Sequence, residues 1–123
     1  MATSLLDHTL LSAHDPATGR YDAKRLADIL AISQKEMAGV VDYTPRGLGK
    51  NPASPHLQPQ LERLVRLVTT LRELLDGDMS LVRVWLKAPH PALGNAKPLD
   101  YLMDGHLDLV EGLVYAIETG QPD

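Results

Sequence analysis

Residues 59–76 carry an apolar pattern that fits one kind of secondary structure. Leucine and valine recur there at steps of three and four residues, at Leu61, Leu64, Val65, Val68, Leu71, Leu74 and Leu75. This spacing places the side chains on one stripe of an α-helix, whereas a half-buried strand would alternate every second residue. Gly77 stands where a left-handed glycine commonly ends a helix. The segment therefore predicts a long amphipathic helix against which the rest of the chain must pack.

Capping residues predict three shorter helices before this segment. Asp22 is placed to cap the first helix, and Ser33 with Glu36 has the spacing of a capping box at the second. Thr44 precedes a proline, and proline at the first helical position loses no intrahelical hydrogen bond. The predicted helices cover residues 23–31, 34–41 and 45–50.

The second half is predicted to hold three further helices, separated by Pro89, Pro98 and a glycine. The apolar face of the first consists of Leu81, Val82, Trp85 and Leu86. Arg83 and Lys87 fall on its opposite face. Gly112 interrupts the last helix at a cost of about 1 kcal/mol relative to alanine, which predicts a close approach by another helix. The predicted helices cover residues 79–87, 98–104 and 106–119.

The core must be built from aliphatic side chains, because phenylalanine is absent and aromatic residues make up only 4% of the 123 residues. Leucine, valine, alanine, isoleucine and methionine suit helix packing, and no segment alternates as a strand does. The predicted fold class is all-α, with an N-terminal helix-turn-helix-like lobe and a C-terminal helical lobe. The expected regions are a poorly ordered arm at 1–21 in which residues 4–11 dock as a short helix, a helix-turn-helix-like region at 22–58 and a helical domain at 59–123.

Several classes of function lack the residues that they require. Cysteine is absent, which excludes disulfides, thiolate zinc sites and cysteine nucleophiles. No phosphate loop or nucleophile elbow occurs, so no catalytic residue, enzyme activity or cofactor is predicted. Asp104, His106 and Asp108 alternate as metal ligands do, but they do not converge at a helix start, so no metal site is predicted. No apolar run approaches the roughly 20 residues that span a bilayer, and a cytoplasmic protein without membrane contact is expected.

The three short helices have the order of a helix-turn-helix, in which a later helix presents polar side chains to the major groove. Residues 61–123 hold ten acidic and six basic side chains, whereas residues 1–60 hold six of each. Because DNA affinity depends on cations, the first half is the candidate for binding operator DNA. The glycines around Leu48 make a weak reading surface, so a helical bundle that binds no DNA is the alternative. The candidate DNA-binding residues are Lys35, Arg46, Lys50 and Asn51.

A proline-bounded turn, PHPALGN at residues 89–95, separates two predicted helices beside the only tryptophan. Proline restricts the unfolded backbone and lowers the entropy lost when a partner docks. In a binding interpretation, Trp85 is a large anchor for that partner. In an architectural interpretation, which spacing alone favours, Trp85 packs in the core, His90 is a turn residue and the prolines keep two helices apart.

The order of rare residues around this turn resembles the toxin-binding C-terminal domain of the Xre/MbcA/ParS antitoxin family. Members of that family show Trp-Leu, a Pro-Ala-Leu-Gly turn, a Pro-Leu-Asp/Glu helix start and a closing helix. The matching residues are Trp85, Leu86, Pro91, Ala92, Leu93, Gly94, Pro98, Leu99, Asp100, Ile117, Glu118 and Gly120. Residues 32–50 are similar to the family's Xre-type helix-turn-helix, although Gly47, Leu48 and Gly49 replace polar positions.

This resemblance implies an antitoxin that binds a RES-domain toxin, an enzyme that degrades NAD or transfers ADP-ribose to a protein. It implies that the antitoxin blocks the toxin's NAD cleft, and that it also binds its own promoter. A cleft that recognises two phosphates is expected to be basic, which suits the acidic second half of this chain. The expected toxin-binding residues are Trp85, His90, Pro91, Leu93, Gly94, Glu111, Glu118, Gln121 and Asp123. The last four of these residues would place the closing segment of the chain across the entrance of the NAD cleft.

Two other interpretations stay open. One is a stand-alone helix-turn-helix transcription regulator whose C-terminal helices only dimerise it, and the other is a helical adaptor with neither partner. A steep salt dependence of operator binding would identify the regulator. A homodimer is also predicted, because the stripe at residues 59–76 has more apolar positions than one short lobe could cover.

Overall fold

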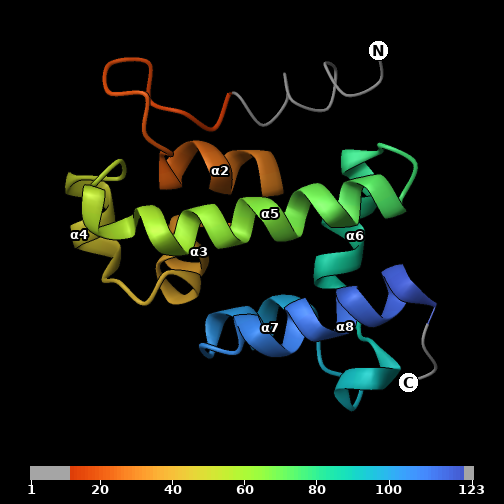
Figure 1. Cartoon of the computed structure of the whole chain (residues 1–123). Coiled ribbons are helices and arrows are strands. Elements are labelled where there is room, and N and C mark those ends of the chain that lie inside the picture. The colour runs from red at the N-terminus through yellow and green to blue at the C-terminus, as the bar shows by residue number, and fades with distance from the viewer. Residues whose placement is uncertain (1–11, 121–123) are drawn as a thin grey trace.

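The computed structural model describes residues 12–120 and shows an all-α fold (Figure 1). The elements in this range are α2 Ala23–Leu30, α3 Gln34–Val40, α4 Pro45–Lys50, the 3-10 helix η1 Pro55–Leu57, α5 Gln58–Leu74, α6 Met79–Lys87, the 3-10 helix η2 Pro91–Leu93, α7 Pro98–Met103 and α8 Leu107–Thr119. Among these described residues, extended pairing is limited to two isolated bridges, His14 with Tyr21 and His90 with Ala96. The predicted all-α class is confirmed.

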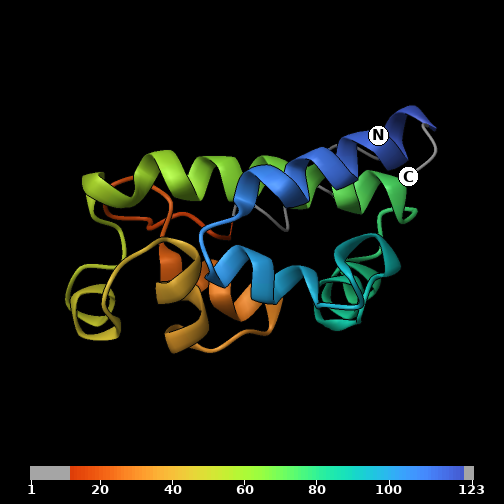
Figure 2. The same ribbon diagram turned by 90° about the horizontal axis from the view of Figure 1, so that it is seen from below.

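The long predicted helix, α5, is the axis of the molecule. It crosses the fold in Figure 1, and Figure 2 shows α8 beside it along one edge. Its stripe is buried by other parts of the same chain at Leu61, Leu64, Val65, Leu67, Val68 and Leu71. Leu74 is 36% exposed at the end of the helix. The chain itself therefore covers this stripe, so the stripe gives no support to the predicted homodimer, which stays a prediction.

The predicted capping residues hold the starts of the short helices. The carboxylate of Asp22 accepts two backbone N–H groups in the first turn of α2, at 2.9 and 3.1 Å. At α3 the Ser33 hydroxyl accepts from the Glu36 N–H at 3.0 Å, and the Glu36 carboxylate accepts from the Ser33 N–H at 2.8 Å. At α4 the Thr44 hydroxyl accepts from the Gly47 N–H at 3.0 Å. All three predicted starts are confirmed.

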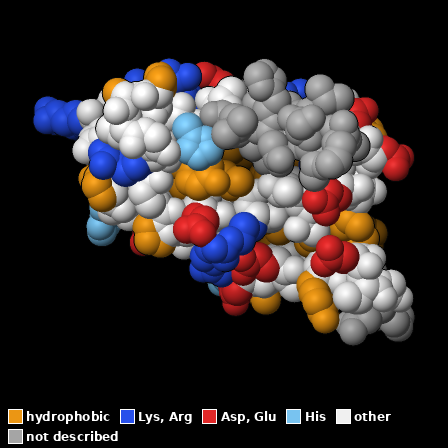
Figure 3. All heavy atoms as spheres, turned by 45° about the horizontal axis from the view of Figure 1, so that its top comes forward, with side chains coloured by type: hydrophobic (Ala, Val, Ile, Leu, Met, Phe, Trp, Pro, Cys, Tyr) orange, Lys and Arg blue, Asp and Glu red, His pale blue; other side chains and the backbone are white. Residues whose placement is uncertain are grey.

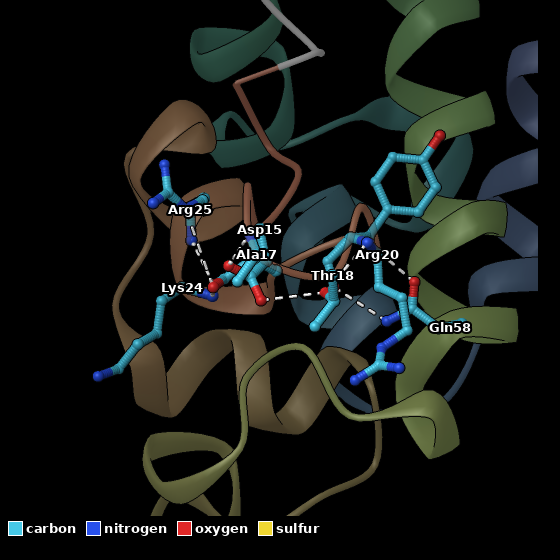
Figure 4. A network of polar contacts seen from close by, with 9 residues as sticks. Asp15, Ala17, Thr18, Arg20, Lys24, Arg25 and Gln58 are labelled. Atoms are coloured by element: carbon cyan, nitrogen blue, oxygen red, sulfur yellow. Dashed lines mark hydrogen bonds and ion pairs between the residues drawn. The ribbon is translucent and has the colours of Figure 1, made fainter.

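Residues 12–21 form a hydrogen-bonded loop, in contrast to the poorly ordered arm expected there (Figure 4). Asp15 accepts a backbone N–H at 3.2 Å and a hydroxyl at 3.0 Å within the turn. The Gln58 carboxamide accepts from the Tyr21 N–H at 2.8 Å and donates to the Tyr21 carbonyl at 2.9 Å. Gln58 thus satisfies both backbone groups of one residue, as a neighbouring strand would. The helix predicted at residues 4–11 lies outside the described residues.

Two cations of α6 bond the C-terminal end of α2. Nε of Arg83 donates to the Ile29 carbonyl at 2.6 Å, and Nζ of Lys87 donates to the Ala31 carbonyl. Carbonyls at a helix end lack intrahelical partners and carry partial negative charge, so cations stabilise them. The face of α6 that was expected to lie opposite the packed side therefore also makes contacts within the chain, with the end of α2. Leu81, which was predicted on the packed face, is 44% exposed.

Gly112 does not mark a close approach between helices of this chain. A Cβ atom built there would meet nothing within 4 Å, because this side of α8 faces solvent. The prediction for Gly112 is wrong within the chain. A close approach occurs instead at Gly39 in α3, where a Cβ atom would lie 3.4 Å from Cβ of Met103 in α7.

One hydrophobic cluster passes through both expected lobes. It extends from Ala13 to Val114 and includes side chains from α2 through α8. Its buried members are aliphatic or methionine, as the composition requires. On the face drawn in Figure 3, charged side chains of both signs surround smaller hydrophobic areas. The packing is continuous across the boundary predicted between residues 58 and 59.

Candidate partner-binding surface

The corner between α6 and α7, residues 88–97, is closed by its own hydrogen bonds. The His90 N–H donates to the Ala96 carbonyl, and the His90 carbonyl accepts from the Asn95 N–H, both at 3.0 Å. Nδ1 of His90 accepts from the Ala92 N–H at 3.1 Å and so caps η2. Because these bonds fix the backbone before any partner arrives, less conformational entropy is lost on binding.

The corner sequence supplies the residue types that this geometry needs. Gly94 and Asn95 have φ angles of 62° and 66°. Glycine and asparagine are the residues that most readily adopt this left-handed conformation. Pro91 begins η2 and Pro98 begins α7, where proline loses no helical hydrogen bond.

Trp85 supports the corner from its inner side. Its ring is partly buried against the core and meets the His90 ring edge-on, with centroids 5.8 Å apart. Trp85 is therefore a packed side chain beside the turn and does not project as an anchor. For Trp85 and His90 the arrangement matches the architectural interpretation.

Beside the corner, η2, α7 and α8 surround an open apolar groove of about 470 Å³. This corner groove is lined by Ala92, Leu93, Tyr101, Leu109 and Leu113. Leu93 and Leu113 are buried, whereas Leu109 is 49% exposed. Sequence reasoning did not single out Tyr101, Leu109 or Leu113. The available signal was the four-residue spacing of two leucines on α8, which places both on one helical face.

Glu111 is engaged by a cation from another helix. Nη2 of Arg63 lies 2.6 Å from Oε1 of Glu111, and Nε of Arg63 donates to Oε2 at 3.4 Å. The hydrogen bond to Glu111 raises the pKa of Arg63 above its ordinary value. The carboxylate expected to face a toxin cleft therefore joins α8 to α5.

The end of α8 presents an exposed acid. Glu118, together with Tyr115, lines a small open groove of about 150 Å³ between α5 and α8. The helix ends at the predicted glycine, Gly120, whose φ is 72°. Gln121 and Asp123, both expected to contact the toxin, lie outside the described residues.

Helices α7 and α8 carry acidic side chains without basic ones. Residues 98–120 contain no lysine or arginine. Apart from the paired Glu111, the acids of this segment are exposed and form no ion pair with any described residue. They are Asp100, Asp104, Asp108 and Glu118. This part of the surface is complementary in charge to a basic protein surface.

The candidate DNA-binding residues are all exposed. Lys35 lies in the first turn of α3, and Asn51 follows the last residue of α4. Arg46 and Lys50 are four residues apart and so share a face of α4. Leu48 is fully buried, so it contributes to the core and not to a surface that could contact bases.

Each histidine that the structure describes lies beside an aromatic ring. The pairs are His14 with Tyr21, His56 with Tyr43, His90 with Trp85 and His106 with Tyr101, with centroid separations from 4.3 to 6.0 Å. Within residues 12–120 no three acidic or histidine side chains come together as a metal site. Over the same range no helix combines the length and apolar character needed to cross a bilayer.

Comparison with known proteins identifies relatives of this fold and sequence. Residues 70–120 match the profile of the antitoxin Xre/MbcA/ParS C-terminal toxin-binding domain. Over 96 residues the chain is 29% identical to the mycobacterial cidal antitoxin MbcA of Mycobacterium tuberculosis and Mycobacterium bovis, an alignment that covers 74% of this chain and 83% of the relative.

A solved structure gives the same picture of the fold. The crystal structure of the M. tuberculosis MbcT-MbcA toxin-antitoxin complex contains a chain that superimposes with a TM-score of 0.57 at 24% identity. The superposition covers 80% of the present chain and 91% of the other. The superposition shows that the two chains share a fold, and the profile match over residues 70–120 confirms the resemblance drawn from the residues around the corner.

Proposed function

We propose that this chain, which belongs to the Xre/MbcA/ParS antitoxin family through residues 70–120, is the antitoxin of a type II toxin-antitoxin system. Its partner is a RES-domain toxin that degrades NAD or transfers ADP-ribose, and it neutralises this toxin by covering the NAD cleft. The observation that carries the proposal is that the matched domain contains the prestructured corner and the acidic helices α7 and α8.

Charge supports this choice of partner. A cleft that holds the two phosphates of NAD needs cationic groups, and α7 and α8 present four exposed acids without a lysine or arginine among them. Complementary charges speed the encounter between two proteins and disfavour wrong orientations. The chain then acts by occupying the cleft entrance, and no bond-making step is assigned to its own residues.

The closing segment is assigned the role of covering the entrance. Glu118 is exposed in the last turn of α8, and the chain continues through Gln121 to Asp123. The corner residues His90, Pro91, Leu93 and Gly94, with Trp85 packed beside them, are assigned a separate contact with the toxin. In this arrangement the corner holds the antitoxin on the toxin, and the carboxylates of the closing segment approach the phosphate-binding groups of the toxin.

Truncation after Thr119 tests this role. We expect the truncated chain to remain bound to the toxin on size-exclusion chromatography while NAD turnover by the complex rises. A full-length variant with residues 121–123 replaced by Gly-Ser-Gly separates the chemistry of the segment from its length. Full inhibition by the truncated chain would rule out the closing segment as the block. Failure of the wild-type chain to associate with the toxin would rule out the antitoxin function itself.

Repression of its own promoter is a second candidate activity, supported by two exposed cations on one face of α4. Arg46 and Lys50 are placed to contact phosphates or base edges. Lys35 and Asn51 are the other two residues that the sequence predicts to bind DNA. We expect a promoter gel shift that weakens steeply with salt and is lost in the Arg46→Ala, Lys50→Ala double variant. The stand-alone regulator predicts the same shift without toxin binding, so both assays are needed to separate the two functions.

A further inference from the structure

We propose that the corner groove receives an apolar side chain of the toxin, and that Gly112 lets the toxin backbone come close to α8 beside it. This inference rests on the proposed function and deepens it by naming the contact surface. It concerns the face formed by Ala92, Leu93, Tyr101, Leu109 and Leu113, which is separate from the closing segment.

Gly112 is one of two helical glycines, with Gly49, that the fold itself does not require, and of these two it is the one beside the corner groove. It lies inside α8, where glycine destabilises a helix by about 1 kcal/mol relative to alanine. Its φ is not among the positive ones, so its backbone conformation does not require glycine. A Cβ atom there would meet nothing within 4 Å, so packing within the chain does not require it either. Gly39 differs, because its Cβ atom would contact Met103.

The position of Gly112 along α8 connects it with the corner groove. Leu109 lies three residues before it and Leu113 lies next to it, and both line the groove. Residues three apart are neighbours on a helix surface, so the bare backbone of Gly112 adjoins the exposed Leu109 side chain. An absent side chain permits close approach of another backbone, which is a common structural use of glycine.

The chemistry around the groove identifies the occupant as a polypeptide. Its lining is aliphatic apart from the Tyr101 ring, whereas a small-molecule site needs several convergent polar groups for orientation. Tyr101, Leu109 and Leu113 of this lining come from residues 98–120, a segment that contains exposed acids and no lysine or arginine. The fitting ligand is an apolar side chain flanked by lysine or arginine. A second copy of this chain would bring like charges together.

A glycine substitution tests the inference without disturbing the fold. Gly112→Gln adds a long side chain that favours helices and has open space on this chain. We expect an unchanged or higher Tm and toxin affinity lower by at least about tenfold, measured by calorimetric titration with the RES-domain toxin that the proposed function assigns as partner. The matched control is Gly49→Gln in α4, another exposed helical glycine with nothing within 4 Å, which is expected to bind as wild type.

A second pair of variants tests the apolar part of the groove. Leu109→Arg places a cation where the proposed partner is basic, and it should weaken binding at least as much as Gly112→Gln. Leu81→Arg is the control, because Leu81 is similarly exposed, at 44% against 49%, but lies on α6 outside the groove. Wild-type affinity in both Gly112→Gln and Leu109→Arg would overturn this inference alone. Absence of binding by the wild-type chain would overturn the proposed function and this inference with it.

Discussion

Arg63 in α5 and Glu111 in α8 form a two-point ion pair between residues that are 48 positions apart in the sequence. Helices α5 and α8, which the pair joins, run next to each other (Figure 2). The burial of Leu107, Val110 and Val114 in the core sets the rotation of α8 about its own axis, and the ion pair is compatible with that rotation. That rotation decides which side of α8 packs on the core and which side carries Leu109 and Gly112.

Glu111→Gln should lower the free energy of unfolding by about 0.5–1 kcal/mol, because the pair is partly solvated and exposed ion pairs contribute little. The two side chains are 42% and 37% exposed. Urea unfolding of the wild type, Glu111→Gln, Arg63→Met and the double variant measures the coupling. We expect the coupling to shrink in 1 M salt, since added ions screen the pair, and equal stability of all four proteins would contradict the assignment.

Substitution by alanine should change the stability of the protein differently at the two glycines of α4. Gly49→Ala is expected to raise the free energy of unfolding by about 0.5–1 kcal/mol, because its Cβ atom would lie in open space. Gly47→Ala should give no such gain, since its Cβ atom would lie 2.6 Å from the Tyr43 ring and 2.9 Å from the Thr44 hydroxyl that caps the helix. Thermal unfolding of the two variants makes the comparison. Equal stabilisation by both substitutions would show that the cap tolerates the added methyl group.

Arg83→Met should destabilise the protein by about 1–3 kcal/mol, because it leaves the Ile29 carbonyl at the end of α2 without its charged donor. The methionine side chain keeps most of the apolar stem, so the loss reports chiefly on the hydrogen bond. Denaturant unfolding measures the change. Arg46→Met removes an exposed arginine outside the core and is expected to stay within about 0.5 kcal/mol of wild type.

The lowered pKa of Asp78 leads to a prediction for the stability of the protein at acidic pH. Its carboxylate caps α6, and the Ser80 hydroxyl and then the Ser80 N–H hold the pKa of Asp78 below its ordinary value. A lowered pKa means that the stabilisation is present above the unfolded-state pKa and is lost as the pH falls through the folded-state pKa. Asp78→Asn keeps a capping oxygen but does not titrate.

The stability difference between wild type and Asp78→Asn should therefore favour wild type near neutral pH and shrink as the pH falls below the ordinary pKa of an aspartate, about 4. Urea unfolding at a series of pH values measures this difference. The other carboxylates titrate equally in both proteins, so the comparison isolates Asp78. A difference that stays constant over the whole range would show that the cap does not depend on the charge.

The starts of the helices could be predicted from the sequence because each depends on a side chain close in sequence. Asp22, Ser33 and Thr44 bond backbone groups within three residues of themselves. The ordered loop at residues 12–21 could not be predicted, because Gln58, which holds Tyr21 by hydrogen bonds, lies 37 positions away from it in the sequence. Local composition cannot reveal a bond of that range.

The same difference between local and distant interactions decides which parts of the candidate site could be predicted. The corner was predicted from its prolines, and the left-handed conformation of Gly94 and Asn95 agrees with their residue types. The corner groove was not, because periodicity marks Leu109 and Leu113 alike as apolar without saying that only one of them is buried. Glu111 was assigned to a partner because no local pattern shows that Arg63 reaches it.

The bonds from Arg83 and Lys87 to the end of α2 end on main-chain oxygens, which every amino acid carries. Mutations that alter the side chains of α2 can therefore accumulate without removing the acceptors. A contact that ends on the backbone thus tolerates changes at the exposed positions of α2 that would abolish an ion pair between two side chains. The joint between α2 and α6 depends in this respect on Arg83 and Lys87 alone.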